Sequence, residues 1–133
     1  MAEGKRILVI NDTQEILELF ETILTDLGHQ VILMSYAPDE LTRIEELKPD
    51  LVIADFIFGP GEKTGWQLLQ KMRMNRSTER IPIIACTASV QAAADAEGYL
   101  LQQRIALVLK PFTISQLEDT VHKVLETERE NAD

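Results

Sequence analysis

The chain has 133 residues, of which 45% are hydrophobic and 26% charged, a composition that suits one globular domain with a single core. Its net charge of −9 and pI near 4.7 argue against direct binding of nucleic acid or of an anionic membrane, because both need a basic face. The single cysteine excludes an internal disulfide or a cysteine-based zinc site, and no apolar run reaches the roughly 18 to 20 residues of a membrane span. We therefore expect a cytoplasmic protein that binds neither nucleic acid nor membrane.

Strand and helix patterns alternate along the first half of the chain. Residues 6–10 form a short apolar strand, and residues 16–27 carry apolar side chains at helical spacing. This first helix stops at Gly28, because glycine suits the position after a helix. Residues 31–34 predict a second strand, and residues 38–48, bracketed by prolines, predict a second helix.

The next apolar run, residues 50–56, predicts a buried strand that ends at the carboxylate of Asp55. In open α/β sheets, ligands bind beyond the carboxyl ends of such strands, so we expect the chemistry of the protein at Asp55. A glycine-rich loop over residues 59–65 follows, then a third helix marked by apolar residues between 66 and 72. Residues 75–80 are polar and predict a turn.

The second half repeats the alternation. Residues 81–87 predict a fourth strand, residues 91–103 an alanine-rich fourth helix, and residues 105–109 a fifth strand. A last helix begins with a capping-box pattern at Thr113 and Gln116, and the charged tail from Thr127 is expected to fray. Five strands that alternate with helices predict an α/β fold with a doubly wound, five-stranded parallel sheet, because each crossover is right-handed and helices cover both faces.

Polar residues stand at the carboxyl ends of four of these strands: Asn11 and Asp12 after the first, Asp55 after the third, Thr87 after the fourth and Lys110 after the fifth. In a parallel sheet these ends meet at one edge. With this ordered set the chain resembles the receiver domain of two-component response regulators, the chemotaxis-regulator type of flavodoxin-like fold.

The resemblance implies one receiver domain over residues 1–133, with a core over about residues 5–126, a short charged tail and strand order 2-1-3-4-5. It implies a signalling switch that takes a phosphoryl group from a sensor histidine kinase or a phosphotransfer protein. Such a domain is not an enzyme beyond its own phosphoryl transfer and dephosphorylation. The surface of the fourth helix, fifth strand and fifth helix would change and control an output protein, with the domain a monomer or a phosphorylation-dependent dimer.

The resemblance also implies the roles of the site residues. Asp55 would be the phosphoacceptor, and Thr87 and Lys110 would bind the phosphoryl oxygens. Mg²⁺ would be bound by Asp12, Asp55, the backbone carbonyl of Ile57 and, through water, Asn11. The chemistry agrees, because clustered carboxylates repel one another unless a cation joins them. Mg²⁺ is the apt cation, since it takes one or two carboxylates and shares oxygens with a phosphoryl group.

The sequence departs from the family pattern at two positions. The first member of the usual acid pair is Asn11, which brings no charge and predicts weaker Mg²⁺ binding, and the usual aromatic switch position holds Leu107. These departures motivate an alternative function, a non-phosphorylated adaptor that acts only as a protein-binding module. An aspartate-nucleophile phosphatase would need Asp-x-Asp after the first strand, and a flavodoxin would place its phosphate against the acid Asp12.

The remaining candidate residues have simpler interpretations. Cys86 lies in an apolar strand and is expected to be a small core residue. His29 and His122 have no partner in the sequence pattern, so we expect them in a solvated loop and on a helix face.

Overall fold

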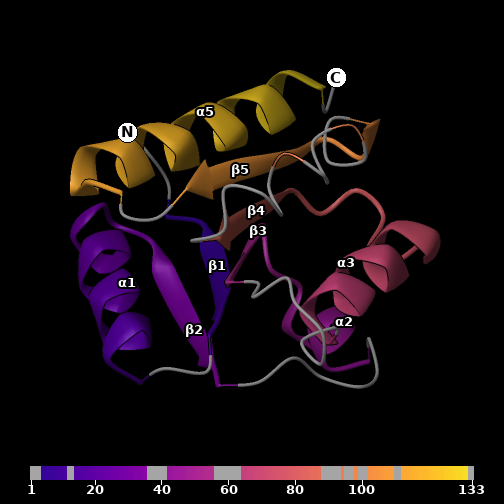
Figure 1. The fold of residues 1–133 in the computed structure, drawn as a ribbon, viewed down its shortest axis with the longest axis horizontal. Helices are drawn as coiled ribbons and strands as arrows, with labels where there is room; N and C mark the ends of the chain where they lie inside the picture. The colour runs from indigo at the N-terminus through magenta and orange to yellow at the C-terminus, as the bar shows by residue number, and fades with distance from the viewer. Residues whose placement is uncertain are drawn as a thin grey trace.

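The computed structural model describes residues 4–11, 14–35, 42–55, 64–87, 102–109 and 112–131, together with Ala94 and Gly98. Its strands form one parallel sheet in the order β2-β1-β3-β4-β5 (Figure 1), which confirms the predicted topology. The strands are β1 (Arg6–Ile10), β2 (Gln30–Met34), β3 (Leu51–Asp55), β4 (Ile83–Thr87) and β5 (Ile105–Leu109).

Helices cover both faces of this sheet, as Figure 1 shows. Helices α1 (Gln14–Asp26) and α5 (Ile114–Asn131) lie on one face, and α2 (Thr42–Leu47) and α3 (Thr64–Met74) lie on the other. The fourth helix, expected over residues 91–103, falls mostly outside the described residues, although Ala94, Gly98 and Gln102 are helical.

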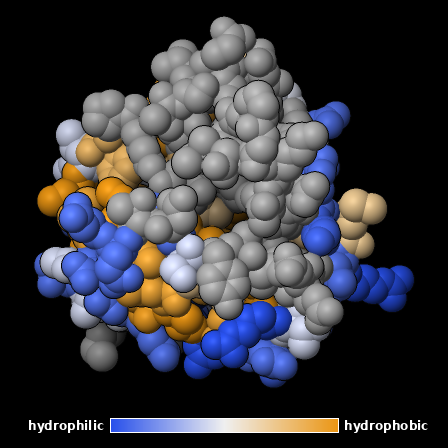
Figure 2. All heavy atoms as spheres, turned by 60° about the horizontal axis from the view of Figure 1, so that its bottom comes forward, coloured by the Kyte–Doolittle hydropathy of each residue, from blue (hydrophilic) through white to orange (hydrophobic). Residues whose placement is uncertain are grey.

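The alternation of side chains along the strands explains why both faces are apolar. In β1, Ile7 and Val9 join the core beneath α1 and α5, whereas Leu8 and Ile10 join the core beneath α2 and α3. A strand buried on both faces must be continuously apolar. Figure 2 shows one side of the molecule, where hydrophilic side chains border the visible apolar side chains at the left and below.

Three segment boundaries differ from the prediction. Gly65 lies inside α3, because that helix begins at Thr64, so the expected loop ends earlier. The first turn of a helix tolerates such a residue, since its N–H groups have no intrahelical partner. Helix α5 continues to Asn131, beyond the point where we expected fraying, because the glutamates of this segment are good helix formers. Strand β4 begins at Ile83, after Pro82, which cannot donate to the ladder.

The expectation of a solvated His29 is wrong. Its side chain is half-buried, and its Nδ1 accepts a hydrogen bond from the backbone N–H of Lys5 at 3.0 Å. Burial lowers the pKa of His29, and the charges of His122 and Lys5 lower it further. His122 itself is exposed on α5, as predicted.

Arg73 joins three chain segments at the amino-terminal edge of the sheet. Its guanidinium, in the last turn of α3, donates to the carbonyl oxygens of Gln103 at 2.9 Å, Glu79 at 3.0 Å and Ile81 at 2.8 Å. These carbonyls belong to the segments that lead into β5 and β4. The planar fork of arginine can satisfy several acceptors at once, so one side chain connects the starts of two neighbouring strands.

None of the described helices combines the length and hydrophobicity that crossing a bilayer demands.

Candidate functional site

The candidate site lies at the carboxyl edge of the sheet, where the strands end at polar residues. Asp55 is the last residue of β3 and Thr87 the last residue of β4, and Asn11 directly follows β1. The parallel registers pair Asp55 with Cys86 and Thr87 with Leu109. The backbone therefore brings together three positions that are far apart in the sequence.

Asn11 is held inside this edge. It is only 2% exposed, and its backbone N–H donates to the carbonyl of Met34 at 3.1 Å, which extends the β1–β2 ladder by one residue. The β1–β3 register ends with Ile10 opposite Ala54, so the next residues along the two strands are Asn11 and Asp55. The uncharged amide of Asn11 is therefore buried beside the predicted phosphoacceptor at a lower cost in free energy than a charged side chain would have there.

The donors expected around a cation are oxygen atoms, which is the set that Mg²⁺ prefers. The described part of this set, the buried Asn11 next to the end of β3, fits a small hard cation because its amide oxygen can accept a hydrogen bond from a metal-bound water. Asp12, Ile57 and Lys110 lie outside the described residues, as do the side chains of Asp55 and Thr87. Their roles remain predictions.

Leu107 occupies the middle of β5, opposite Ala85 of β4. Its side chain is half-buried and packs against the core beneath α2 and α3. Leu107, which stands at the position where the resembled family usually has an aromatic switch residue, is thus an aliphatic side chain that packs on the core beside the small Ala85. Leu109, two residues further along β5, is 43% exposed.

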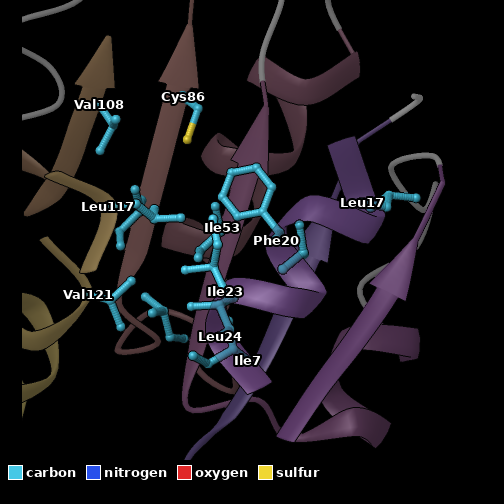
Figure 3. Packing of buried hydrophobic residues seen from close by; sticks show 13 residues of the cluster. Ile7, Leu17, Phe20, Ile23, Leu24, Ile53, Cys86, Val108, Leu117 and Val121 are labelled. Carbon is cyan, nitrogen blue, oxygen red and sulfur yellow. The ribbon is translucent and has the colours of Figure 1, made fainter. Parts of the chain in front are cut away.

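The segment after β5 is attached to α1 by an aromatic contact that the sequence reasoning did not foresee. The rings of Phe20 and Phe112 have centroids 5.8 Å apart and are tilted by 51°. Phe20 is buried in the core beneath α1 and α5, where Figure 3 shows it with Ile53 and Cys86. The available signal was the position of Phe112 directly after Lys110 and Pro111.

The start of α5 confirms the capping box. The Thr113 N–H donates to Oε1 of Gln116 at 2.8 Å, and the Gln116 N–H donates to Oγ1 of Thr113 at 3.0 Å. Two N–H groups that lack an intrahelical partner are thereby satisfied. These two hydrogen bonds fix the chain at Thr113, the residue before α5.

Known proteins share this fold and sequence pattern. A family model described as the response regulator receiver domain matches residues 7–122. The response regulator Rre1 of Synechocystis is 28% identical over 100% of this chain, which covers 57% of that protein. The phosphate regulon transcriptional regulatory protein PhoB of Rhizobium meliloti is 30% identical over 90% of this chain and 52% of its own length.

A solved structure agrees with these relatives. The CheY-like response regulator receiver domain protein of Methanospirillum hungatei superposes with a TM-score of 0.80 at 25% identity, over 97% of this chain and 99% of its own. The chain spans about half the length of the two curated relatives above. It belongs to the response regulator receiver family, whose members act in phosphorylation-based two-component signalling.

Proposed function

We propose that the chain is a phosphorylation-dependent switch in which Asp55 accepts a phosphoryl group from a sensor histidine kinase or a phosphotransfer protein. The observation that carries this proposal is the meeting of Asn11, Asp55 and Thr87 at one edge of the sheet, at the ends of β1, β3 and β4. Family membership supports it. The switch spans residues 1–133 as one receiver domain and works in the cytoplasm.

The transfer itself needs few protein groups. A carboxylate oxygen of Asp55 attacks the phosphorus of the phosphohistidine, a P–O bond forms while the P–N bond breaks, and the released imidazole takes up a proton from water. Asp12, Asp55, the Ile57 carbonyl and, through water, Asn11 would hold Mg²⁺, which when bound neutralises charge on the transferring group. The protein mainly positions the aspartate.

Thr87 and Lys110 then bind the phosphoryl group. It adds a charge of roughly −1.5 to −2 and new acceptor oxygens, to which the threonine hydroxyl and the lysine ammonium donate. Shifting the populations of two conformations from 1:99 to 99:1 requires that one be stabilised over the other by about 5.5 kcal/mol. A few charge-assisted hydrogen bonds at about 1.5 to 3 kcal/mol each can supply this free energy. Because Thr87 and Leu109 are neighbours across β4 and β5, a movement at Thr87 is transmitted to the edge strand.

The output is a change of the surface formed by the fourth helix, β5 and α5, which controls a partner protein. The net charge of −9 supports a protein partner over nucleic acid for this chain, and the domain acts as a monomer or a phosphorylation-dependent dimer. Relatives such as PhoB are named as transcriptional regulators, which is a property of those longer proteins.

Incubation with acetyl phosphate and Mg²⁺, followed by intact mass spectrometry, tests the switch. The wild type should gain the mass of one phosphoryl group, and Asp55→Ala should not. Asp119→Ala, which removes an exposed carboxylate on α5, is the matched control and should gain the same mass as the wild type. A mass gain that persists in Asp55→Ala would exclude Asp55 as the acceptor.

The alternative is a receiver-like adaptor that binds a protein partner without phosphorylation. The uncharged, buried Asn11 after β1 and the half-buried Leu107 at the switch position motivate it, whereas the match to the receiver domain favours the switch. An unmodified wild type at every Mg²⁺ and phosphodonor concentration would support the adaptor and contradict the switch.

A further inference from the structure

Cations gather at the end of α3, at the edge of the sheet opposite the candidate site. Residues 71–80 contain four cations and a single acid, Glu79, and Arg104 directly precedes β5. Five cations against one acid give these residues a net charge of +4, so the rest of the chain carries −13, which together make the total of −9. A concentration of one sign of charge creates a local potential that attracts the opposite sign.

The fold joins these cations from separate segments of the chain. The guanidinium of Arg73 donates to the carbonyl oxygens on either side of Arg80 and to that of Gln103, which directly precedes Arg104, at 2.8 to 3.0 Å. The hydroxyl of the buried Thr78 donates to a carbonyl in the last turn of α3 at 2.8 Å and holds the turn against the helix. Figure 1 shows the end of α3 and the starts of β4 and β5 on the same side of the molecule.

The side chains at this place are accessible to a partner. We call the exposed residues the basic patch: Lys71, Met74, Arg76, Arg80 and Arg104. Met74 is 85% exposed, more than any other large apolar side chain in the described part of the chain. Methionine is flexible and adapts to irregular apolar surfaces, so the patch combines positive charge with one adaptable apolar contact.

A neighbouring acid does not cancel this charge. Asp50 precedes β3, the strand next to β4, and its Oδ2 accepts a hydrogen bond from the backbone N–H of Arg6 at 2.8 Å. Its carboxylate is therefore directed toward β1, on the side of β3 away from β4. Glu79 remains the single acid within residues 71–80.

We propose that the basic patch binds an acidic segment of a partner protein, which places an apolar side chain against Met74. Charge complementarity identifies this partner. Exposed charges are screened beyond about 8 Å at physiological ionic strength, so a narrow segment on the patch is attracted by the patch alone. A membrane or a nucleic acid duplex extends over the neighbouring surface, where the charge of −13 resides. The inference goes beyond the phosphorylation switch and does not depend on Asp55.

Fluorescence anisotropy tests the patch with a labelled probe peptide of glutamates around a central leucine. The wild type should bind this peptide at low ionic strength, and the affinity should fall about tenfold between roughly 50 and 300 mM salt because exposed charge pairs are screened. Arg76→Glu and Arg80→Glu should each weaken binding about fivefold, since an attraction becomes a repulsion. Both positions are exposed, and circular dichroism checks that the variants are folded. Arg76→Gln, which only removes the charge, should weaken binding about twofold.

Lys123→Glu is the matched control. It makes the same change in net charge at an exposed position on α5, which covers the other face of the sheet. Its affinity for the peptide should stay within about twofold of the wild type. A loss as large as in Arg76→Glu would mean that the peptide responds only to net charge, and it would overturn the patch.

Met74→Ser tests the apolar contact. It should weaken binding about threefold at low and at high salt, because the burial of apolar surface is not screened by ions. Unchanged affinity in Met74→Ser would overturn the role of Met74.

Three further measurements separate the possible partners. Peptide binding that is absent at low salt would overturn the inference, as would tighter binding of phosphatidylserine vesicles or of a DNA duplex that Arg76→Glu abolishes. A salt-sensitive dimer that Arg76→Glu dissociates would assign the patch to a second copy of the chain instead. Asp55→Ala should bind the peptide as tightly as the wild type, because Asp55 ends β3 at the opposite edge. A wild type that is never phosphorylated would therefore overturn the switch and leave the patch intact.

Discussion

Replacing Arg73 by methionine removes the guanidinium that joins the starts of β4 and β5 while keeping much of the side chain's apolar stem. Among the hydrogen bonds described above, those to the carbonyls of Ile81 and Gln103 are partly buried, and the one to Glu79 is exposed. A hydrogen bond to a charged group contributes about 1.5 to 3 kcal/mol, and the exposed one adds little. We therefore expect Arg73→Met to lower the free energy of unfolding by about 3 kcal/mol.

Urea unfolding followed by circular dichroism measures this change. With a slope near 2 kcal/mol per molar urea, the midpoint should fall by about 1.5 M. Arg73→Lys should recover at most about a third of the loss, because an ammonium lacks the planar fork that reaches several carbonyls. Arg76→Met, at an exposed position in the following turn, is the control and should change the stability by less than about 0.5 kcal/mol.

Two results would refute this reasoning. A midpoint for Arg73→Met within about 0.3 M of the wild type would mean that the three carbonyls are equally well satisfied by water. A wild-type urea midpoint in Arg73→Lys would mean that the positive charge alone, and not the planar guanidinium, provides the stabilisation. Because Arg73 lies at the edge opposite the candidate site, the rate of phosphorylation of the folded variant should be unchanged.

Three further predictions concern single residues. Gly4→Ala should destabilise the protein by about 1 to 3 kcal/mol in urea unfolding, because its added Cβ would collide with the carbonyl oxygen of Gly28; an unchanged midpoint would contradict this close approach. Burial and two cationic neighbours hold the folded-state pKa of His29 below its ordinary value of 6.5, so the unfolded chain binds more protons. The contribution of His29 to the free energy of unfolding should be fully present above about pH 6.5 and be lost as the pH drops toward the folded-state pKa. In His29→Gln, the urea midpoint should therefore depend less on pH over that window. Asn11→Asp should tighten Mg²⁺ binding about tenfold in calorimetry, since a charge is added beside the cation, whereas equal affinity would show that Asn11 does not weaken the metal site.

Much of the fold follows from local patterns. Strands such as β1 and β3 are continuous apolar runs because helices cover both faces, and the alternation with helical segments requires parallel crossovers of one hand. Once the strands are parallel, their carboxyl ends meet at one edge. The approach of Asn11, Asp55 and Thr87 was therefore predictable without coordinates.

The helix boundaries were less predictable. The inclusion of Gly65 in α3 and the extension of α5 to Asn131 depend on energies of a few tenths of a kcal/mol to about 1 kcal/mol per residue. Composition alone does not separate such small differences between helix and loop.

Sequence patterns by themselves determined that strands such as β1 are buried on both faces and which face of a helix such as α1 is buried. They also determined the order of the described elements and the gathering of polar residues at one edge, because each of these depends on the local repeat of the chain. Only the tertiary structure decided that Arg73 reaches the carbonyl of Gln103, that His29 accepts the N–H of Lys5, and that Phe112 packs on Phe20. These partners are far apart in the sequence, and their contacts depend on how α1, α3 and α5 pack against the sheet. Helical and strand periodicity specify a face but not the partner that the face meets, so such contacts appear only when the whole chain is assembled.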